Sequence, residues 1–247
     1  MKLLSWNIMH GGGTRIPRIV DAIAAHDADV IALTEFRTTS GAAICGELAT
    51  RGWPYSESTG PAGSDNGVCI ISRTRVVRTP SDPALSENSA RWLDVDLPQY
   101  GFGVGVQHIM CSSSKLGGGI PGEAKTRFWN AVIAAAGARL HAPHMFVGDW
   151  NTGLHRMDEK GKTFACAEHF AKLSALGWTD LWRHHNTGAT EWTWYSKLKG
   201  GAVGNGFRLD HAFASPSLCP RIISCRYSHT EREAGLSDHS VVIVEVG

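Results

Sequence analysis

The sequence lacks the features that indicate a zinc-knuckle protein, a membrane protein or a strongly basic nucleic-acid binder. Its six cysteines form no CxxC pair, and no apolar run approaches the roughly 18 residues of a membrane span. The formal net charge is only +1, so any contact with a polyanion must come from a local patch. Met1 leads straight into a predicted strand, without the charged and then apolar stretch of a leader. We therefore expect a soluble, cytoplasmic monomer with reduced thiols and no membrane partner.

The chain has the length and composition of one large folded unit. It contains 247 residues, of which 43% are hydrophobic, enough to bury a substantial core. No internal repeat, low-complexity segment or linker interrupts it, so we predict a single domain over residues 1–247. Predicted strands outnumber predicted helices, which indicates a layered α+β domain with two sheets.

Apolar periodicity gives the approximate positions of the elements. Ile16, Ile19, Val20 and Ile23 recur at helical spacing and predict a helix over residues 17–25 with proline in its first turn. Further helices are predicted over residues 42–49, 123–140 and 164–176. Strands are predicted over residues 2–7, 30–33, 67–72, 91–97, 102–108, 144–148, 207–213, 222–227 and 241–246, and residues 178–182 begin a strand or turn. Four histidines are expected on the surface: His141, His144, His184 and His185.

Polar side chains recur where these strands end. Asp149 and Asn151 follow the buried strand over residues 144–148, and their spacing of two points them to the same side. His108 ends another strand, on its apolar-facing side, before a polar loop over residues 112–119. Each such residue alone is more often a turn, cap or core residue. Together they form a larger set of strand-end residues: Asn7, Glu35, His108, Asp149, Asn151, Asp210, Asp238 and His239.

The chemistry of this set favours a hard metal ion and phosphate. Oxygen ligands dominate and thiolates are absent from the set, which favours Mg²⁺, with Mn²⁺ as an alternative. Glu35 and Asp238 are the best ligand candidates, with Asn7 close by. Histidines can donate hydrogen bonds or protons to a phosphate near neutral pH. Asp210 and His239 form a natural pair in which the carboxylate fixes the tautomer of the imidazole.

Five short motifs along the chain resemble those of a known family. They are Ser5-Trp6-Asn7, Leu33-Thr34-Glu35, Gly148-Asp149-Trp150-Asn151, Arg208-Leu209-Asp210 and Ser237-Asp238-His239. In this order and spacing they resemble the endonuclease/exonuclease/phosphatase superfamily, which includes exonuclease III-like AP endonucleases, deoxyribonucleases, neutral sphingomyelinases and inositol polyphosphate 5-phosphatases. The resemblance covers residues 3 to 246. Trp150 stands where the family usually has Phe.

This resemblance implies a fold and a set of roles. The implied fold is a four-layer, deoxyribonuclease-like α/β sandwich in which helices flank two packed mixed sheets. By the resemblance, Glu35 would bind the metal near Asn7 and Asp238, and Asp149 would orient or deprotonate the attacking water. Asn151 would steady the scissile phosphate, while His239, held by Asp210, would stabilise phosphoryl charge or protonate the leaving group. His108 stands where the exonuclease III branch has Tyr and other branches have His.

The loops resemble the exonuclease III branch most closely. By this resemblance the substrate-binding residues would be Lys125, Trp194, Phe207, Arg208 and Leu209. Lys197, Lys199 and Arg208 could neutralise backbone phosphates, and Trp192 or Trp194 could stack on a base. The structural alternatives are that Trp192 and Trp194 form a buried aromatic ladder and that Lys197 and Lys199 lie in a solvated loop.

We therefore predict a Mg²⁺-dependent phosphodiester hydrolase, a nuclease acting on DNA. One alternative is a phosphodiesterase or phosphatase acting on a small phosphate ester, because the net charge is nearly neutral. A second alternative is a non-catalytic phosphate-binding module.

Overall fold

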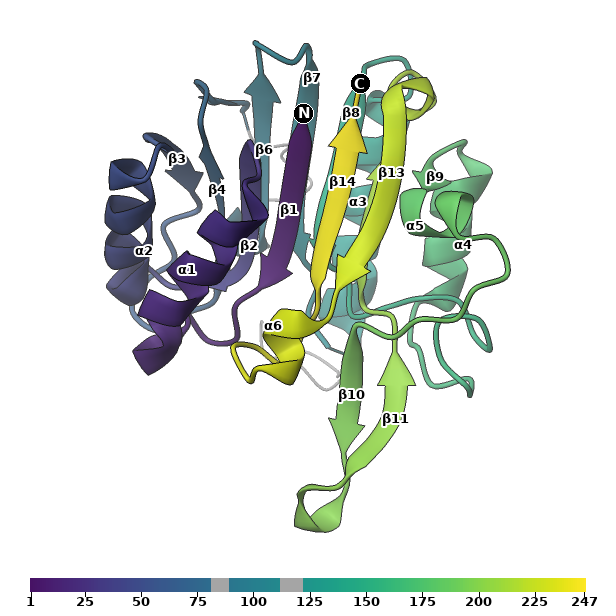
Figure 1. Cartoon of the computed structure of the whole chain (residues 1–247). Coiled ribbons are helices and arrows are strands. Elements are labelled where there is room, and N and C mark those ends of the chain that lie inside the picture. Colours follow the sequence, from purple (N-terminus) through teal and green to yellow (C-terminus); the bar gives the residue numbers. More distant parts are fainter. Residues whose placement is uncertain (81–88, 112–121) are drawn as a thin grey trace.

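Two sheets form the body of the protein in the computed structural model, which describes residues 1–80, 89–111 and 122–247. In this part of the chain each sheet has six strands, and a separate two-stranded hairpin projects from one end (Figure 1). The first sheet runs in the order β13 (Ile222–Ser228), β14 (Val241–Val246), β1 (Lys2–Asn7), β2 (Val30–Phe36), β4 (Gly67–Ser72) and β3 (Tyr55–Ser58). The second runs β5 (Val77–Arg78), β6 (Trp92–Leu97), β7 (Phe102–His108), β8 (His144–Asp149), β12 (Asp210–Ala214) and β9 (Thr179–Asp180).

Both sheets are mixed, as predicted. β1 pairs in parallel with β2, and β7 pairs in parallel with β8. The flanking pairs, such as β1 with β14 and β8 with β12, are antiparallel. Because parallel neighbours run in the same direction, β1 and β2 end together at one edge of the first sheet. β7 and β8 likewise end together in the second sheet.

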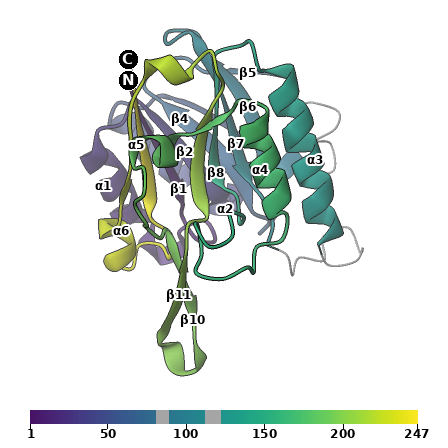
Figure 2. The ribbon, with the colours of Figure 1, turned by 90° about the vertical axis from the view of Figure 1, so that its right-hand side faces the viewer.

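Helices cover the outer face of each sheet, which gives four layers (Figure 2). α1 (Ile16–His26) and α2 (Thr38–Thr50) pack on the first sheet, and α3 (Glu123–Ala138) and α4 (Ala167–Ala175) pack on the second. Strand alternation separates the layers, since Leu3 faces the other sheet while Leu4 faces the helices. This arrangement confirms the predicted four-layer sandwich.

The predicted helices and strands are present, but β3, β5, β10 (Trp194–Lys197) and α6 (Thr230–Glu233) were not predicted, and four predictions differ from the structure. The helix predicted from residue 164 begins at Ala167. The segment after Trp178 forms the short β9 and then α5 (Leu181–His185), whose N-cap is Asp180. His144 is buried rather than on the surface, because it is the first residue of the buried β8, and its Nε2 lies 3.0 Å from Oδ1 of Asp94. The polar loop predicted over residues 112–119 lies outside the described residues.

The fourth difference concerns the strand predicted over residues 207–213. It is interrupted, because β11 (Val203–Phe207) ends at Phe207 and β12 begins at Asp210. Between them, the N–H of Arg208 donates to the carbonyl of Asp158 and the N–H of Leu209 donates to Thr193 Oγ1. These two residues therefore bond to loops instead of to a sheet ladder, and β12 starts afresh at Asp210.

One edge of the sandwich collects the strand ends that carry polar residues. The carboxyl ends of β1 and β2 lie at the edge from which the hairpin of β10 (Trp194–Lys197) and β11 projects, beside the short helix α6 (Thr230–Glu233) (Figure 1). Both termini lie at the opposite edge. None of the helices in the described part of the chain is long and apolar enough to span a membrane.

Candidate active site

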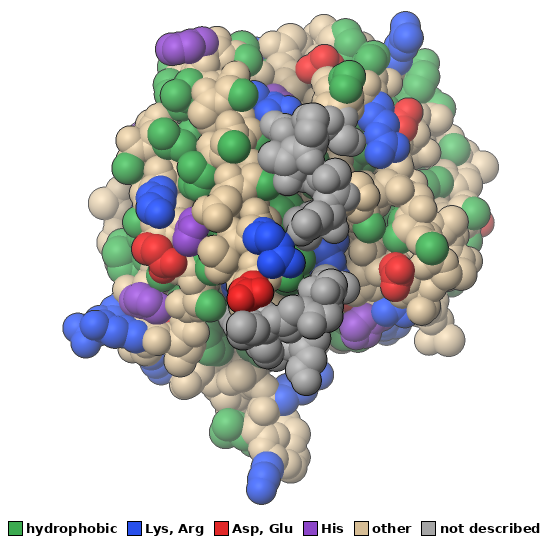
Figure 3. All heavy atoms as spheres, turned by 180° about the vertical axis from the view of Figure 1, so that it is seen from behind, with side chains coloured by type: hydrophobic (Ala, Val, Ile, Leu, Met, Phe, Trp, Pro, Cys, Tyr) green, Lys and Arg blue, Asp and Glu red, His purple; other side chains and the backbone are tan. Residues whose placement is uncertain are grey.

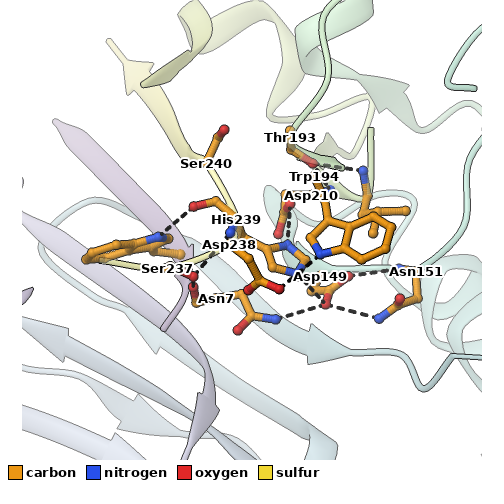
Figure 4. A network of polar contacts seen from close by, with 12 residues as sticks. Asn7, Asp149, Asn151, Thr193, Trp194, Asp210, Ser237, Asp238, His239 and Ser240 are labelled. Atoms are coloured by element: carbon orange, nitrogen blue, oxygen red, sulfur yellow. Dashed lines mark hydrogen bonds and ion pairs between the residues drawn. The ribbon is translucent and has the colours of Figure 1, made fainter. Parts of the chain in front are cut away.

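A cavity of about 490 Å³ opens at the edge of the sandwich where the strands end. Eight of the predicted site residues line it: Glu35, His108, Asp149, Asn151, Trp194, Leu209, Asp238 and His239. Asn7 and Asp210 contact these residues from behind, as Figure 4 shows for part of the network. The structure therefore brings the eight strand-end residues of the sequence pattern into one site.

Asp149 is held at the centre of the site. Its Oδ2 accepts hydrogen bonds from Asn7 Nδ2 and Asn151 Nδ2, both at 3.0 Å, and its Oδ1 accepts from the N–H of Asn151 at 3.0 Å. Gly148 precedes it with a φ of 141°, and a Cβ there would lie 2.0 Å from the carbonyl oxygen of Gln107. A glycine is therefore required for β8 to deliver Asp149 into the cavity.

Burial makes the Asp149 carboxyl a weaker acid than usual. Desolvation raises the pKa of Asp149 to about 7, although the nearby His239 opposes the shift. The negative charges of Asp210 and Glu35 add to the increase. A carboxyl with such a pKa can accept and release a proton near neutral pH.

The predicted pair of Asp210 and His239 is present. His239 Nδ1 lies 2.9 Å from Asp210 Oδ2, and both side chains are buried. Burial alone lowers the pKa of His239, but the carboxylates of Asp210 and Asp149 outweigh it and raise the pKa to about 10. The imidazole is therefore protonated at neutral pH, with Nε2 4.0 Å from Asp149 Oδ2.

His108 has the opposite charge state from His239. Burial, together with the adjacent Arg91, holds the pKa of His108 well below its usual value. Arg91 Nη1 lies 3.0 Å from His108 Nδ1, and since guanidinium is only a donor, Nδ1 must be the acceptor. The neutral ring then carries its hydrogen on Nε2, which lies 3.7 Å from Asp149 Oδ2 and 3.9 Å from Glu35 Oε1.

Glu35 and Asp238 present carboxylates to the cavity in a way that suits a hard cation. Glu35 Oε2 accepts from the N–H of His10 at 2.7 Å, and Oε1 lies 3.3 Å from Asn7 Nδ2. Asp238 Oδ2 accepts from Trp194 Nε1 at 3.1 Å. Both side chains are partly exposed to the cavity and retain lone pairs, so the donor set fits Mg²⁺ or Mn²⁺, which bind one or two carboxylates and keep several waters.

Another group of potential metal-ligating atoms lies around the Asp210–His239 pair. Asp149, Asp210 and His239 offer atoms within 4.8 Å of one another. In the metal-free protein the carboxylates of Asp210 and Asp149 raise the pKa of His239 to about 10, so they hold its ring as a cation. Glu35 and Asp238 stay the expected metal ligands.

Three predicted side-chain roles require correction. Arg208 is fully buried, with its guanidinium in ion pairs to Asp158 and Asp180, so it cannot neutralise a DNA phosphate. Lys125 is also buried, and its ammonium donates to the carbonyl of Asn151 at 2.5 Å, so it supports the end of β8 from inside the protein.

The third correction concerns Asn151. Its Nδ2 donates to Asp149 Oδ2 and to the carbonyl of Ile109, both at 3.0 Å. Both amide hydrogens are therefore used within the protein, so the amide group orients Asp149 and has no hydrogen left for the scissile phosphate.

The remaining substrate-binding candidates lie at or near the cavity. Trp194 and Leu209 line it, and Phe207 packs behind Trp194 with ring centroids 5.8 Å apart. Lys197 also lines the cavity, on the projecting hairpin. The indole of Trp194 is partly exposed, which leaves part of its ring surface accessible.

Arg91, Thr193 and His10 belong to the site but were not predicted from the sequence. Arg91 and His10 line the cavity, while Thr193 is buried behind it and binds the backbone of Asp210. The position of Arg91 at the start of a predicted strand was the only available signal, and the structure begins that strand at Trp92. Thr193 and His10 lie in loops whose paths depend on the tertiary fold.

The comparisons with known proteins agree with this geometry. Residues 4–239 match the model of the endonuclease/exonuclease/phosphatase family. No curated protein sequence matches the chain. Solved structures with a similar fold include the 3′ phosphatase NExo from Neisseria bound to a product DNA hairpin, with a TM-score of 0.84 at 19% identity. An AP endonuclease from Archaeoglobus fulgidus gives 0.85 at 17%, and the 3′-5′ exonuclease NExo from Neisseria meningitidis gives 0.82 at 21%. Each of the three matches covers 100% of this chain and 99% of the other, and confirms the fold.

Proposed function

Because this chain belongs to the endonuclease/exonuclease/phosphatase family and is a hydrolase of phosphate ester bonds, we propose that it cleaves the phosphodiester backbone of DNA with a bound divalent cation. One observation carries the proposal. A carboxyl with a pKa of about 7 and a protonated imidazole face each other across 4.0 Å, in a cavity that also holds Glu35 and Asp238. This arrangement can activate a water and balance the charge that develops on a phosphate.

Asp149 is the proposed base. Its Oδ2 faces the cavity beside His108 and His239, while Asn7 and Asn151 hold the carboxylate in place. In its deprotonated form it orients a water and takes its proton as the water attacks phosphorus. General-base catalysis of this kind contributes roughly 10²- to 10⁴-fold in rate.

The two histidines are the proposed hydrogen-bond donors to the reacting phosphate. His239 is a cation held by Asp210, so its Nε2–H can stabilise a phosphoryl oxygen or protonate the leaving oxygen. His108 remains neutral because Arg91 occupies its Nδ1, and it offers Nε2–H from the other side of Asp149. Donors that are fixed before the reaction stabilise the developing charge without further reorganisation.

The cation would be held by Glu35 and Asp238, with Asn7 adjacent to Glu35. When bound, Mg²⁺ or Mn²⁺ would neutralise negative charge on the scissile phosphate. The hydrogen bonds from the N–H of His10 to Glu35 and from Trp194 Nε1 to Asp238 hold the two carboxylates in place.

Local features of the surface support DNA as the substrate. The hairpin beside the cavity carries Lys197 and Lys199, and basic side chains are visible along it in Figure 3. Elsewhere in that view basic and acidic side chains are interspersed, in keeping with the net charge of +1. Trp194 and Leu209 give the cavity an apolar wall suited to a sugar or base. The similar Neisseria 3′ phosphatase is seen with a DNA hairpin.

A small phosphate ester is the second candidate. The cavity volume of about 490 Å³ would enclose such a ligand, and its binding needs no extended basic groove. The two proposals share the catalytic residues and differ only in what the hairpin contacts.

Hydrolysis with Mg²⁺, with and without a chelator, tests the proposal. Three substrates are compared: a plasmid, a duplex oligonucleotide with one abasic site, and bis-p-nitrophenyl phosphate. Chelator-sensitive cleavage of either DNA is the expected result. Turnover of the small diester with both DNAs intact would favour the second candidate, and no turnover of any substrate would contradict both.

A further inference from the structure

The Asp210–His239 pair joins two different sheets. Asp210 is the first residue of β12 in the second sheet, whereas His239 lies in the loop before β14 of the first sheet. Their contact of 2.9 Å therefore depends on how one sheet edge is placed against the other. A small shift of either segment would lengthen this hydrogen bond and weaken it.

Thr193 is bonded to both segments. Its Oγ1 accepts hydrogen bonds from the N–H of Leu209 at 2.9 Å and from the N–H of Asp210 at 3.2 Å. Its carbonyl oxygen accepts from the N–H of Ser240 at 2.9 Å. One residue thus holds the start of β12 through its side chain, as Figure 4 shows, and the residue after His239 through its backbone.

Burial and further hydrogen bonds fix the position of Thr193 and of the two segments that it contacts. Thr193 is fully buried, and its own N–H donates to the carbonyl of Phe207 at 2.9 Å. The next residue, Trp194, donates from Nε1 to Asp238, which stands directly before His239. From β13, Tyr227 Oη donates to the carbonyl of Asp210 at 2.8 Å, which adds a second hold on the start of β12. The hydroxyl of Thr193 is therefore placed where its loss would leave buried N–H groups without an acceptor.

We propose that Thr193 is a positioning residue, whose side-chain oxygen sets the distance and orientation between Asp210 and His239. It contacts neither substrate nor metal in this assignment and acts through Asp210. The kinetic part of the proposal rests on the proposed function, since it assumes that the Asp210–His239 pair serves phosphate hydrolysis. The geometric part concerns the pair alone.

Three variants separate positioning from stability. Thr193→Val keeps the shape of the side chain and removes the acceptor oxygen, whereas Thr193→Ser keeps that oxygen. Ser215→Ala is the matched control, because Ser215 follows the other end of β12 and its Oγ also accepts two backbone N–H bonds, from His144 at 3.0 Å and Leu218 at 3.3 Å. It is fully buried like Thr193 but lies at the opposite edge of the sheet.

Two readouts are measured on each folded variant. Steady-state kinetics on the abasic-site duplex gives kcat and KM separately. Proton NMR gives the downfield resonance of the His239 Nδ1–H, which is identified by its disappearance in His239→Gln. For Thr193→Val we expect kcat to fall about 10- to 100-fold with little change in KM, and the resonance to move upfield or broaden. Thr193→Ser should restore both, and Ser215→Ala should change neither.

The outcomes that would overturn the proposal are specific. A wild-type kcat and an unchanged His239 resonance in Thr193→Val would overturn the proposal. A loss of kcat in Ser215→Ala equal to that in Thr193→Val would also overturn it. The NMR readout needs no turnover, so an unchanged resonance in Thr193→Val overturns the proposal even if the protein hydrolyses no DNA. If Thr193→Val does not fold, Thr193→Cys replaces it, because sulfur is a weaker acceptor and should give an intermediate effect.

Discussion

Asp210 Oδ2 and His239 Nδ1 lie 2.9 Å apart, although Asp210 begins β12 of the second sheet and His239 lies in the loop before β14 of the first. This contact keeps His239 protonated at neutral pH, while Asp149, 4.0 Å from the other ring nitrogen, has a pKa of about 7. Under the proposed function Asp149, with a pKa of about 7, is the base and His239, with a pKa of about 10, is the acid.

The pH dependence of kcat/KM follows from these two groups. Asp149 must be deprotonated, so the rate should fall as the pH drops below about 7, and His239 must be protonated, so the rate should fall as the pH rises above about 10. Asp210→Asn removes the charge that raises the pKa of His239, which should bring the upper limb toward the ordinary value of about 6.5 and lower the maximal rate roughly 10²-fold or more. A pH–rate profile of both proteins measures this, and an upper limb that stays in place would contradict the assigned pair.

Arg91 should fix the tautomer of His108. In Arg91→Met the Nδ1 of His108 loses its donor, so the ring should no longer be held with its hydrogen on Nε2. We expect kcat to fall about 10- to 100-fold, as for other partners that orient a reacting imidazole. Nitrogen NMR of the labelled ring distinguishes the tautomers. A ring that keeps the wild-type tautomer in Arg91→Met would show that other contacts fix it.

Arg208 should matter for stability rather than for DNA binding. Arg208→Met would leave the largely buried carboxylate of Asp180 without an ion-pair partner and Asp158 with Arg183 alone, and breaking such a buried pair typically lowers the free energy of unfolding by about 3–5 kcal/mol. Urea denaturation measures this change. The exposed Arg226 on β13 provides the control, since Arg226→Met should change the free energy by no more than about 0.5 kcal/mol. Equally small changes in the free energy of unfolding of both variants would contradict a structural role for the buried Arg208.

Lys197 should contribute to DNA binding through its charge. It lines the cavity from the exposed hairpin, so Lys197→Met should raise KM for DNA and lower the slope of log affinity against log salt by about one. Lys172, exposed on α4 in the outer layer, is the matched control and should leave the slope unchanged when replaced by Met. Fluorescence anisotropy at several salt concentrations gives the slope. Identical slopes for the two variants would exclude the hairpin from the DNA interface.

Part of the site could be predicted from local sequence alone. Asn7, Glu35 and Asp149 each lie at the end of an apolar run. The side chains of Asp149 and Asn151 do meet as predicted, but through a turn in which Asn151 has a φ of 46°, not through strand alternation. Parallel pairing of β1 with β2 and of β7 with β8 then brings such ends together, as the layered fold requires. The strand-end positions of these site residues depend on short-range hydrophobic periodicity, which can be read from the sequence.

Other parts depend on contacts between distant segments. Arg208 follows a strand-like pattern, and only the folded chain shows that Asp158 and Asp180, 50 and 28 residues away, bury its guanidinium. Lys125 resembles a substrate ligand in sequence, yet the packing of α3 directs its ammonium to the carbonyl of Asn151. The link of Arg91 to His108 likewise joins the beginning of one strand to the end of its neighbour.

The most direct test of the account compares wild-type protein with Asp149→Asn on one DNA substrate in the presence of Mg²⁺. We predict that the wild type hydrolyses the DNA and that a chelator stops it. The variant should lose about 10²- to 10⁴-fold in rate while binding the same DNA with similar affinity, because the change removes the base and keeps the shape of the cavity. A variant that cleaves DNA at the wild-type rate, or wild-type protein that cleaves equally well with the chelator, would contradict the account.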